Sequence, residues 1–322
     1  MKKTANRIVA ILLLLCIVSV SAYGVEYLIP VGQVIGLQLS DGNVTIAAFD
    51  DILGSPAREA GLMIGDTIVS IDGRSIHDAQ DIRAALNCSG GQVEVTVRRK
   101  NGCHTLTLSP QITTEGPKLG VYLSQGITGI GTVTWYDPET KRFGTLGHGV
   151  HDGSGSLLAL SSGTVFDAAV ASVKQGLCGE PGQLRGSMDS RRCLGVVERN
   201  TPQGVFGTAQ DGWQGQAVPV GCSDQVHTGK ATIRSTVSGR AVREYSVEIV
   251  KLYPKSNSTG RNMLIRITDP ALLEVTGGIV QGMSGSPIIQ DGKLVGAVTH
   301  VLVNDLTTGY GIFIENMLEA AE

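Results

Sequence analysis

The sequence predicts a mainly β protein with an exported leader, a small α+β unit and a larger all-β unit. The chain has 322 residues, of which 43 are glycine and only 4% are aromatic. Frequent glycines between short Val-, Ile- and Thr-containing runs favour strands joined by tight turns. The length and the 42% hydrophobic content allow two domains, each with its own core. A net charge of −3 and the lack of a basic run argue against a nucleic-acid partner.

Residues 1–27 have the pattern of a targeting segment. Lys2, Lys3 and Arg7 precede an uncharged, largely apolar stretch at residues 8–25, and the next charge is Glu26. A basic flank before an apolar segment is typical of a secretory signal, but this stretch is also long enough for a short membrane anchor. Both interpretations stay open. Either one predicts an exported protein that associates with a membrane through residues 8–25.

The first folded unit is predicted at residues 28–112 and mixes strands with two helices. The string GLMIGDTIVSIDGRSI at residues 61–76 places turn glycines around an alternating apolar run. This string resembles the PDZ domains associated with bacterial proteases. The expected strands are residues 34–39, 44–48, 68–71, 93–99 and 105–108, and the expected helices are residues 55–60 and 78–87.

The resemblance to a PDZ domain implies a peptide-binding groove between a sheet edge and a helix. Ile35-Gly36-Leu37 matches the hydrophobic-glycine-hydrophobic loop whose N–H groups bind a terminal carboxylate. Ile82 and Leu86 would line the side-chain pocket. The alternative is that Ile35 and Leu37 are ordinary core residues of a strand.

The second unit is predicted at residues 119–322, after a linker at residues 109–117. Short Gly-bounded apolar runs follow one another, and the first amphipathic helix comes at residues 314–321. Many short strands with frequent turns favour a β-barrel or sandwich.

A Gly-Met-Ser-Gly-Ser-Pro run in this unit resembles the nucleophile loop of chymotrypsin-like serine proteases. Its glycines allow a sharp turn that exposes Ser284 as a nucleophile. The N–H groups of Gly282 and Ser284 would then form an oxyanion hole. The alternative is a Gly/Ser-rich hairpin loop without chemistry.

His148 lies between two glycines after an apolar run, which suits a general base that must reach a hydroxyl. His151 follows three residues later, so a metal-dependent hydrolase is an alternative. No third ligand cluster lies near the two histidines in the sequence, and the six cysteines form no metal-spaced pair, so we predict no metal and no cofactor.

Three further strings carry a more specific resemblance. GTLGHGV, IRITDP and GGIVQGMSGSPIIQDGKLVGAVTHVLVNDLTTGYGI closely resemble the sporulation stage IV protein B serine peptidases of spore-forming bacteria. The resemblance implies a chymotrypsin-like β-barrel domain with Ser284 as nucleophile, His148 as base and Asp269 as the third member of the triad. From the residues alone, Asp152 and Asp167 are rival candidates for that acid.

The same resemblance implies a role in signalling from forespore to mother cell. The peptidase would cross the inner forespore membrane and act in the space between the two membranes. It would cleave its own N-terminal region and then a regulator subunit of a membrane-embedded metalloprotease complex, which leads to activation of the late sigma factor. The alternative function is an inactive PDZ scaffold that only binds a membrane partner.

Overall fold

The computed structural model describes residues 27–153, 155–177, 179–257 and 260–322. The predicted signal or anchor therefore lies outside the described residues, except for its last residue. Within the described ranges, no helix has the length and apolar character needed to span a bilayer.

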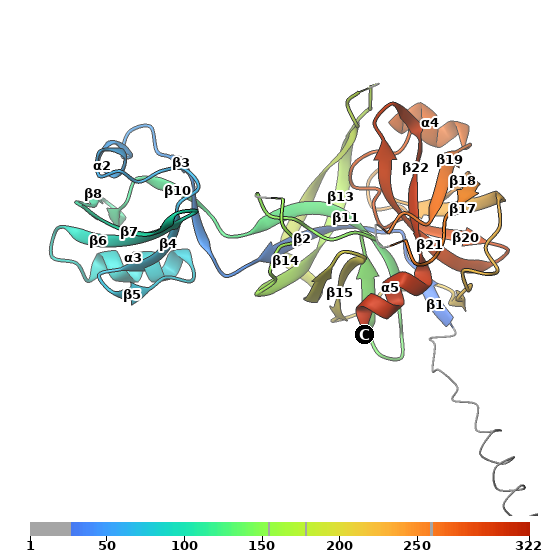
Figure 1. Ribbon diagram of the computed structural model, residues 1–322, viewed down its shortest axis with the longest axis horizontal. Helices are drawn as coiled ribbons and strands as arrows, with labels where there is room; N and C mark the ends of the chain where they lie inside the picture. The colour runs from blue at the N-terminus through green and yellow to red at the C-terminus, as the bar shows by residue number, and fades with distance from the viewer. Residues whose placement is uncertain (1–26, 154, 178, 258–259) are drawn as a thin grey trace, which may run out of the picture.

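The larger part of the molecule consists of two β-barrels (Figure 1). In the first, strands β2, β11, β12, β15, β14 and β13 pair in a ring, because β11 contacts both β2 and β12. Strands β1 and β16 extend the sheet from β11. The strands of this sheet are β1 (Tyr27–Pro30), β2 (Val34–Ser40), β11 (Ile127–Tyr136), β12 (Arg142–Thr145), β13 (Ser162–Lys174), β14 (Gln183–Thr201), β15 (Gly204–Ala209) and β16 (Val218–Pro219).

The second barrel is closed by six antiparallel strands in the order β17-β18-β19-β22-β21-β20. Helix α4 connects β19 to the loop before β20, and helix α5 ends the chain. The elements are β17 (Gly229–Ser235), β18 (Arg243–Leu252), β19 (Met263–Ile267), α4 (Pro270–Thr276), β20 (Pro287–Gln290), β21 (Lys293–Leu302), β22 (Asp305–Phe313) and α5 (Ile314–Ala321).

A separate α+β unit lies at one end of the molecule (Figure 1). Its sheet has the order β10-β3-β4-β6-β7, with β5 paired to β4 and a β8–β9 hairpin beside it. The elements are β3 (Val44–Phe49), α2 (Ser55–Glu59), β4 (Thr67–Ile71), β5 (Arg74–Ser75), α3 (Ala79–Asn87), β6 (Val93–Arg99), β7 (Gly102–Leu108), β8 (Gln111–Thr113), β9 (Gly116–Lys118) and β10 (Val121–Ser124).

The α+β unit is an insertion within the first barrel. The chain enters it after β2, leaves it after β10, and returns to pair β11 with β2. The predicted first unit, residues 28–112, therefore began too early, since β1 and β2 belong to the barrel. It also ended too early, because β10 at residues 121–124 completes the sheet of this unit.

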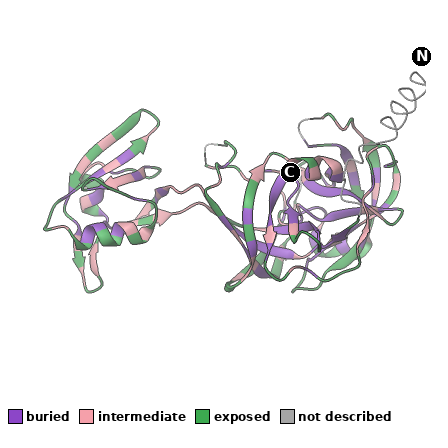
Figure 2. Cartoon of the chain, turned by 90° about the horizontal axis from the view of Figure 1, so that it is seen from below, coloured by how far each residue is buried: buried purple, intermediate pink, exposed green. Residues whose placement is uncertain are grey.

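Each unit has a core of its own (Figure 2). Buried side chains of the second barrel form one cluster around Ile233, Ile265 and Ile288, which also takes in a few residues of β2, β13 and β14. Those of the first barrel form another around Phe143 and Val165. A third cluster fills the α+β unit. The apolar face of α5 closes a fourth cluster that joins strands of both barrels, which fixes the barrels against one another.

The predicted helices α2, α3 and α5 are confirmed and follow local sequence signals, whereas α4 was not predicted. Asp78 caps α3 by accepting from the N–H groups of Gln80 and Asp81, and Ile82 and Leu86 face the core from its inner side. Pro56 occupies the first turn of α2, where a missing N–H costs nothing.

Candidate active site

Ser284 lies in the tight loop between α4 and β20 at the junction of the two barrels. Gly285 has φ +96, and a Cβ there would approach the carbonyl oxygen of Thr132 in β11 to 2.1 Å. Only glycine fits such a position. The loop is also tied to β11 through Thr132, whose hydroxyl donates to the Gly282 carbonyl at 2.8 Å and whose N–H donates to the Ser284 carbonyl at 3.1 Å.

The N–H groups of this loop divide into two sets. Those of Met283 and Gly285 donate to the carbonyls of Val280 and Val298 within the fold. Those of Gly282 and Ser284, the pair expected to form an oxyanion hole, donate to no atom of the described part of the chain. Two N–H groups without an acceptor in the described part of the chain, next to the Ser284 hydroxyl, are the kind of donors that an oxyanion hole requires.

His148 follows β12, where Leu146 and Gly147 adopt positive φ and turn the chain towards the second barrel. Its Nδ1 lies 3.0 Å from the carbonyl oxygen of Gly149. A carbonyl can only accept, so Nδ1 carries the hydrogen and Nε2 carries the free electron pair. Burial lowers the pKa of His148 below its usual 6.5, against the opposite effect of this hydrogen bond.

His148 and Ser284 line the same cleft, which has a volume of about 460 Å³. The Ser284 hydroxyl donates to the Thr299 carbonyl at 2.7 Å, so it must turn away from Thr299 to reach the histidine. The rest of the lining is mostly apolar and includes no carboxylate, lysine or arginine. Its other walls are Leu37, Leu39, Ile127, Gly129, Ile130, Leu146, Val150, Pro181, Ile279, Val280, Gln281, Gly282, Thr299, His300, Val301 and Val303.

His300 packs beside the catalytic candidate, with ring centroids 5.1 Å apart. Burial, helped by the nearby His148, Arg261 and His151, lowers the pKa of His300 to about 4. His300 is therefore uncharged at neutral pH and does not oppose protonation of His148. Among the described residues, His, Cys, Asp and Glu side chains form no group of three or more suited to a metal ion.

Residues 115–318, which are more than half of the chain, match the family model "SpoIVB peptidase S55". The chain belongs to this family. It is a serine peptidase, in agreement with the resemblance noted from the sequence. A second model, "PDZ domain", matches residues 52–99, which identifies the inserted α+β unit.

Individual relatives match more narrowly. "Putative zinc metalloprotease CPE1693" of Clostridium perfringens is 35% identical over 83 residues, which is 26% of this chain and 25% of that protein. The chain thus spans about a quarter of that relative's length. Among solved structures, the active form of the Rv3671c protease from M. tuberculosis is 17% identical, with a TM-score of 0.34, covering 61% of this chain and 74% of its own. The PDZ domain of the SdrC-like protein from Listeria monocytogenes is 23% identical, with a TM-score of 0.22, and the match covers 25% of this chain and 85% of that domain.

The S55 peptidase domain does not bring Asp269 to His148, contrary to the expected triad contact. Asp269 caps α4, where its carboxylate accepts from the N–H of Leu272 at 3.1 Å and from the N–H of Ser246 at 3.2 Å. Among the described residues no carboxylate is hydrogen-bonded to His148. The side chain of Asp269 therefore has its partners at the edge of the second barrel.

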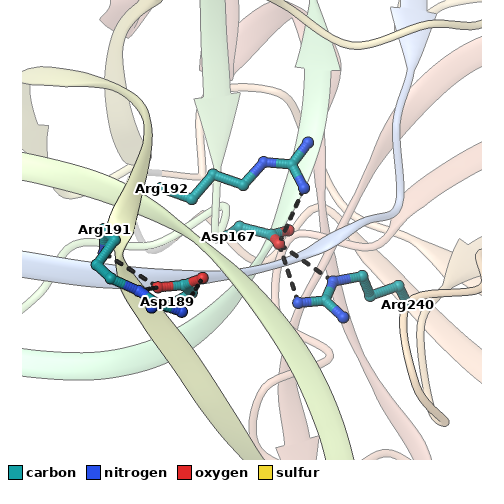
Figure 3. Close-up of polar contacts among 5 residues, drawn as sticks. All are labelled: Asp167, Asp189, Arg191, Arg192 and Arg240. Atoms are coloured by element: carbon teal, nitrogen blue, oxygen red, sulfur yellow. Dashed lines mark hydrogen bonds and ion pairs between the residues drawn. The ribbon is translucent and has the colours of Figure 1, made fainter.

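The two rival acids are also engaged elsewhere. Asp167 is buried in β13 and pairs with Arg240 at 3.1 Å and Arg192 at 3.5 Å (Figure 3). Asp152 accepts from the N–H of Ser156 in the turn that follows His148.

Residues 35–37 do not form the predicted PDZ groove of this S55 peptidase. Ile35, Gly36 and Leu37 lie in β2, which is paired on both edges, with β11 and β13, so no peptide can add there. A Cβ on Gly36 would approach the side chain of Met188 to 2.4 Å. The expected carboxylate-binding role of these three residues is therefore wrong.

The groove lies instead between α3 and β10, where Ile82 and Leu86 line a cavity of about 280 Å³. Strand β10 pairs with β3 on one edge and is the end strand of its sheet. Leu119-Gly120-Val121 leads into it and has the same hydrophobic-glycine-hydrophobic pattern as residues 35–37, so the sequence did contain the signal. The charged residues at the groove are Arg83, Lys118 and Asp50, and Lys118 pairs with Glu115 at 2.6 Å.

Proposed function

We propose that this S55 peptidase is an endopeptidase in which Ser284 is the nucleophile and His148 is the general base. The observation that carries the proposal is that these two residues, from different barrels, line one cleft. His148 is present as the tautomer whose Nε2 can accept a proton. Gly282 and Ser284 would supply the N–H donors of the oxyanion hole.

The reaction follows the general serine peptidase course. The Ser284 hydroxyl turns from the Thr299 carbonyl to His148, gives its proton to Nε2 and attacks the scissile carbonyl. The N–H groups of Gly282 and Ser284 stabilise the oxyanion. His148 then protonates the leaving amine as the C–N bond breaks. Water, deprotonated by His148, hydrolyses the acyl-enzyme, and the serine regains its proton.

The proposed physiological substrates follow the family. The peptidase cleaves its own chain in the N-terminal part of residues 23–35, before β1 begins the first barrel. It also cleaves a membrane-associated regulator of an embedded metalloprotease. The cleavages transmit a signal from forespore to mother cell during sporulation. Membrane association through residues 8–25 would hold the enzyme near both substrates until it is released.

The PDZ groove is proposed to select those substrates. An extended peptide can add to the free edge of β10 and place a side chain against Ile82 and Leu86. Arg83 would attract a terminal carboxylate, whereas Lys118 already pairs with Glu115. The inactive scaffold is the alternative function, in which this groove would be the only binding site.

The test compares wild-type protein with Ser284→Ala and maps new N-termini by mass spectrometry. We expect self-cleavage in the wild type and none in the variant. Ser286→Ala is the matched control, since Ser286 is fully buried and its hydroxyl contacts Ser235 rather than the cleft. Cleavage by Ser284→Ala at the wild-type rate would exclude Ser284 as nucleophile, and a wild type that does not react with a fluorophosphonate probe would favour the scaffold.

A further inference from the structure

A second cavity adjoins the apolar cleft at the two imidazole rings. It has a volume of about 550 Å³, and His148, Val150 and His300 line both cavities. Unlike the cleft, it contains a permanent charge, because Arg261 forms part of its wall. A side chain that enters this cavity therefore meets a guanidinium next to the catalytic site. The remaining residues that line it are Gly149, His151 and Pro202.

The segment that carries Arg261 is anchored on the second barrel. The neighbouring Asn262 is fully buried, and its side-chain oxygen accepts from the N–H of Phe313 at 3.2 Å. The guanidinium of Arg261 lies 5.0 Å from the centroid of the Tyr310 ring. Tyr310 is the partner of His300 across β21 and β22, so this contact holds the positive charge beside His300.

Arg261 has no acidic partner in the described part of the chain. None of the ion pairs found there includes its guanidinium, and no Asp or Glu of the described residues lines the cavity. The Arg261 side chain is exposed, so a ligand can reach it. Burial, the nearby His148 and then the charge of Arg261 lower the pKa of His300 to about 4, so this charge acts on the catalytic site. An accessible guanidinium without an anion is suited to bind a carboxylate.

A substrate can occupy both cavities at once. An extended peptide advances about 3.3 Å per residue, so a side chain two to four residues from the scissile bond lies about 7–13 Å along the chain. That length is enough to pass the rings of His148 and His300, whose centroids are 5.1 Å apart. A peptide bound at Ser284 with an apolar side chain in the cleft therefore presents a more distant side chain to Arg261.

We propose that Arg261 is a specificity-determining residue that binds the carboxylate of an Asp or Glu side chain two to four residues from the scissile bond. The inference deepens the proposed function and rests on it, because it requires that Ser284 attacks a peptide in the adjoining cleft. The preferred substrates combine an apolar residue beside the scissile bond with an acidic residue farther along. Since burying an unpaired carboxylate in the apolar cleft is costly, the two cavities also fix the register of the peptide.

The test measures kcat/KM for end-blocked peptides that keep an apolar residue beside the scissile bond and carry Glu, Gln or Lys at one other position. Blocked ends leave the side chain as the only source of a carboxylate. At one position two to four residues from the bond, wild type should cleave the Glu peptide about 2- to 5-fold more efficiently than the Gln peptide, the size of an exposed ion pair. Arg261→Gln should lose this preference, and Arg261→Glu should favour Lys over Glu.

Arg58→Glu is the matched control. Arg58 is also exposed and its guanidinium also lies over a ring, 4.9 Å from the centroid of Phe49, but in the PDZ unit. This variant should keep the wild-type preference for Glu. A wild type without that preference, or an Arg261→Glu variant that retains it, would overturn the proposal. If Ser284→Ala still cleaves the peptides, the proposed function itself fails; if it is inert and Arg261→Glu prefers the wild-type peptides, only the role of Arg261 fails.

A second measurement does not depend on turnover. Each peptide competes with a fluorophosphonate probe for Ser284, so the rate of modification reports how well the peptide occupies the cleft. The Glu peptide should slow modification more than the Lys peptide in wild type, and the order should reverse in Arg261→Glu. Equal protection by the two peptides in both proteins would refute the proposal. Should Arg261→Glu not fold, Arg261→Gln decides, because an unchanged preference for Glu in that variant would refute the proposal as well.

Discussion

Replacing Asp269 separates a capping role from a catalytic one. Its carboxylate accepts two backbone N–H groups at the start of α4, from Leu272 and Ser246. Asp269→Ala removes the cap, which costs about 1 kcal/mol within a range of about 0.5–2. For a domain of this size, each kcal/mol lowers Tm by about 2–4 °C. Asp269→Asn keeps a side-chain oxygen that caps almost equally well, so its stability should stay within about 0.5 kcal/mol of wild type.

The two roles differ widely in the size of their effect on the reaction. If Asp269 were the triad acid, Asp269→Asn would lower kcat on the order of 10⁴-fold, equivalent to about 5.5 kcal/mol in the barrier. From the capping geometry we expect kcat to stay within about tenfold of wild type, because the substitution should raise the activation barrier by less than about 1.4 kcal/mol.

The assay combines thermal unfolding with kcat on one peptide for wild type, Asp269→Asn and Asp269→Ala. Ser284→Ala is the reference, because it should lose activity without losing stability. A collapse of kcat in Asp269→Asn at unchanged Tm would refute the reasoning and restore Asp269 as the acid partner of His148.

Three other outcomes can be measured on the same protein. Because the pKa of His148 lies below 6.5, the imidazole stays unprotonated in mildly acidic solution. The acid limb of the pH profile of kcat/KM should therefore have its midpoint below pH 6.5, and a midpoint above pH 7 would contradict this. Gly285→Ala should abolish activity and folding, because its Cβ would overlap the Thr132 carbonyl. Gly292 also has a positive φ, +75, but open space surrounds it, so Gly292→Ala should lower the free energy of unfolding in denaturant by only about 1–2 kcal/mol. A peptide library should be cleaved beside apolar side chains and not beside charged ones, because the cleft holds no charged partner; efficient cleavage after Lys, Arg, Asp or Glu would refute that assignment of the cleft.

Local signals in the sequence predicted helices α2, α3 and α5, the family and two candidate reactive residues. Asp78 and the spacing of Ile82 and Leu86 specify α3 without reference to the rest of the chain. The glycines around His148 and Ser284 similarly indicate exposed, sharply turned backbone. These features depend on residues a few positions apart, so the sequence contains them directly.

The tertiary structure alone decided which strands pair and where side chains point. The period of a strand predicts its two faces but not its neighbour, so β2 was placed in the PDZ unit although it pairs across the insertion with β11. Chain spacing likewise did not show that Asp269 turns towards α4, although an Asp before a Pro at a helix start is also a capping pattern. Asn200 likewise carries no signal in the sequence, because the two residues that it contacts, Val150 and Leu158, lie 50 and 42 residues away along the chain and meet it only when β14 folds against the loop after β12.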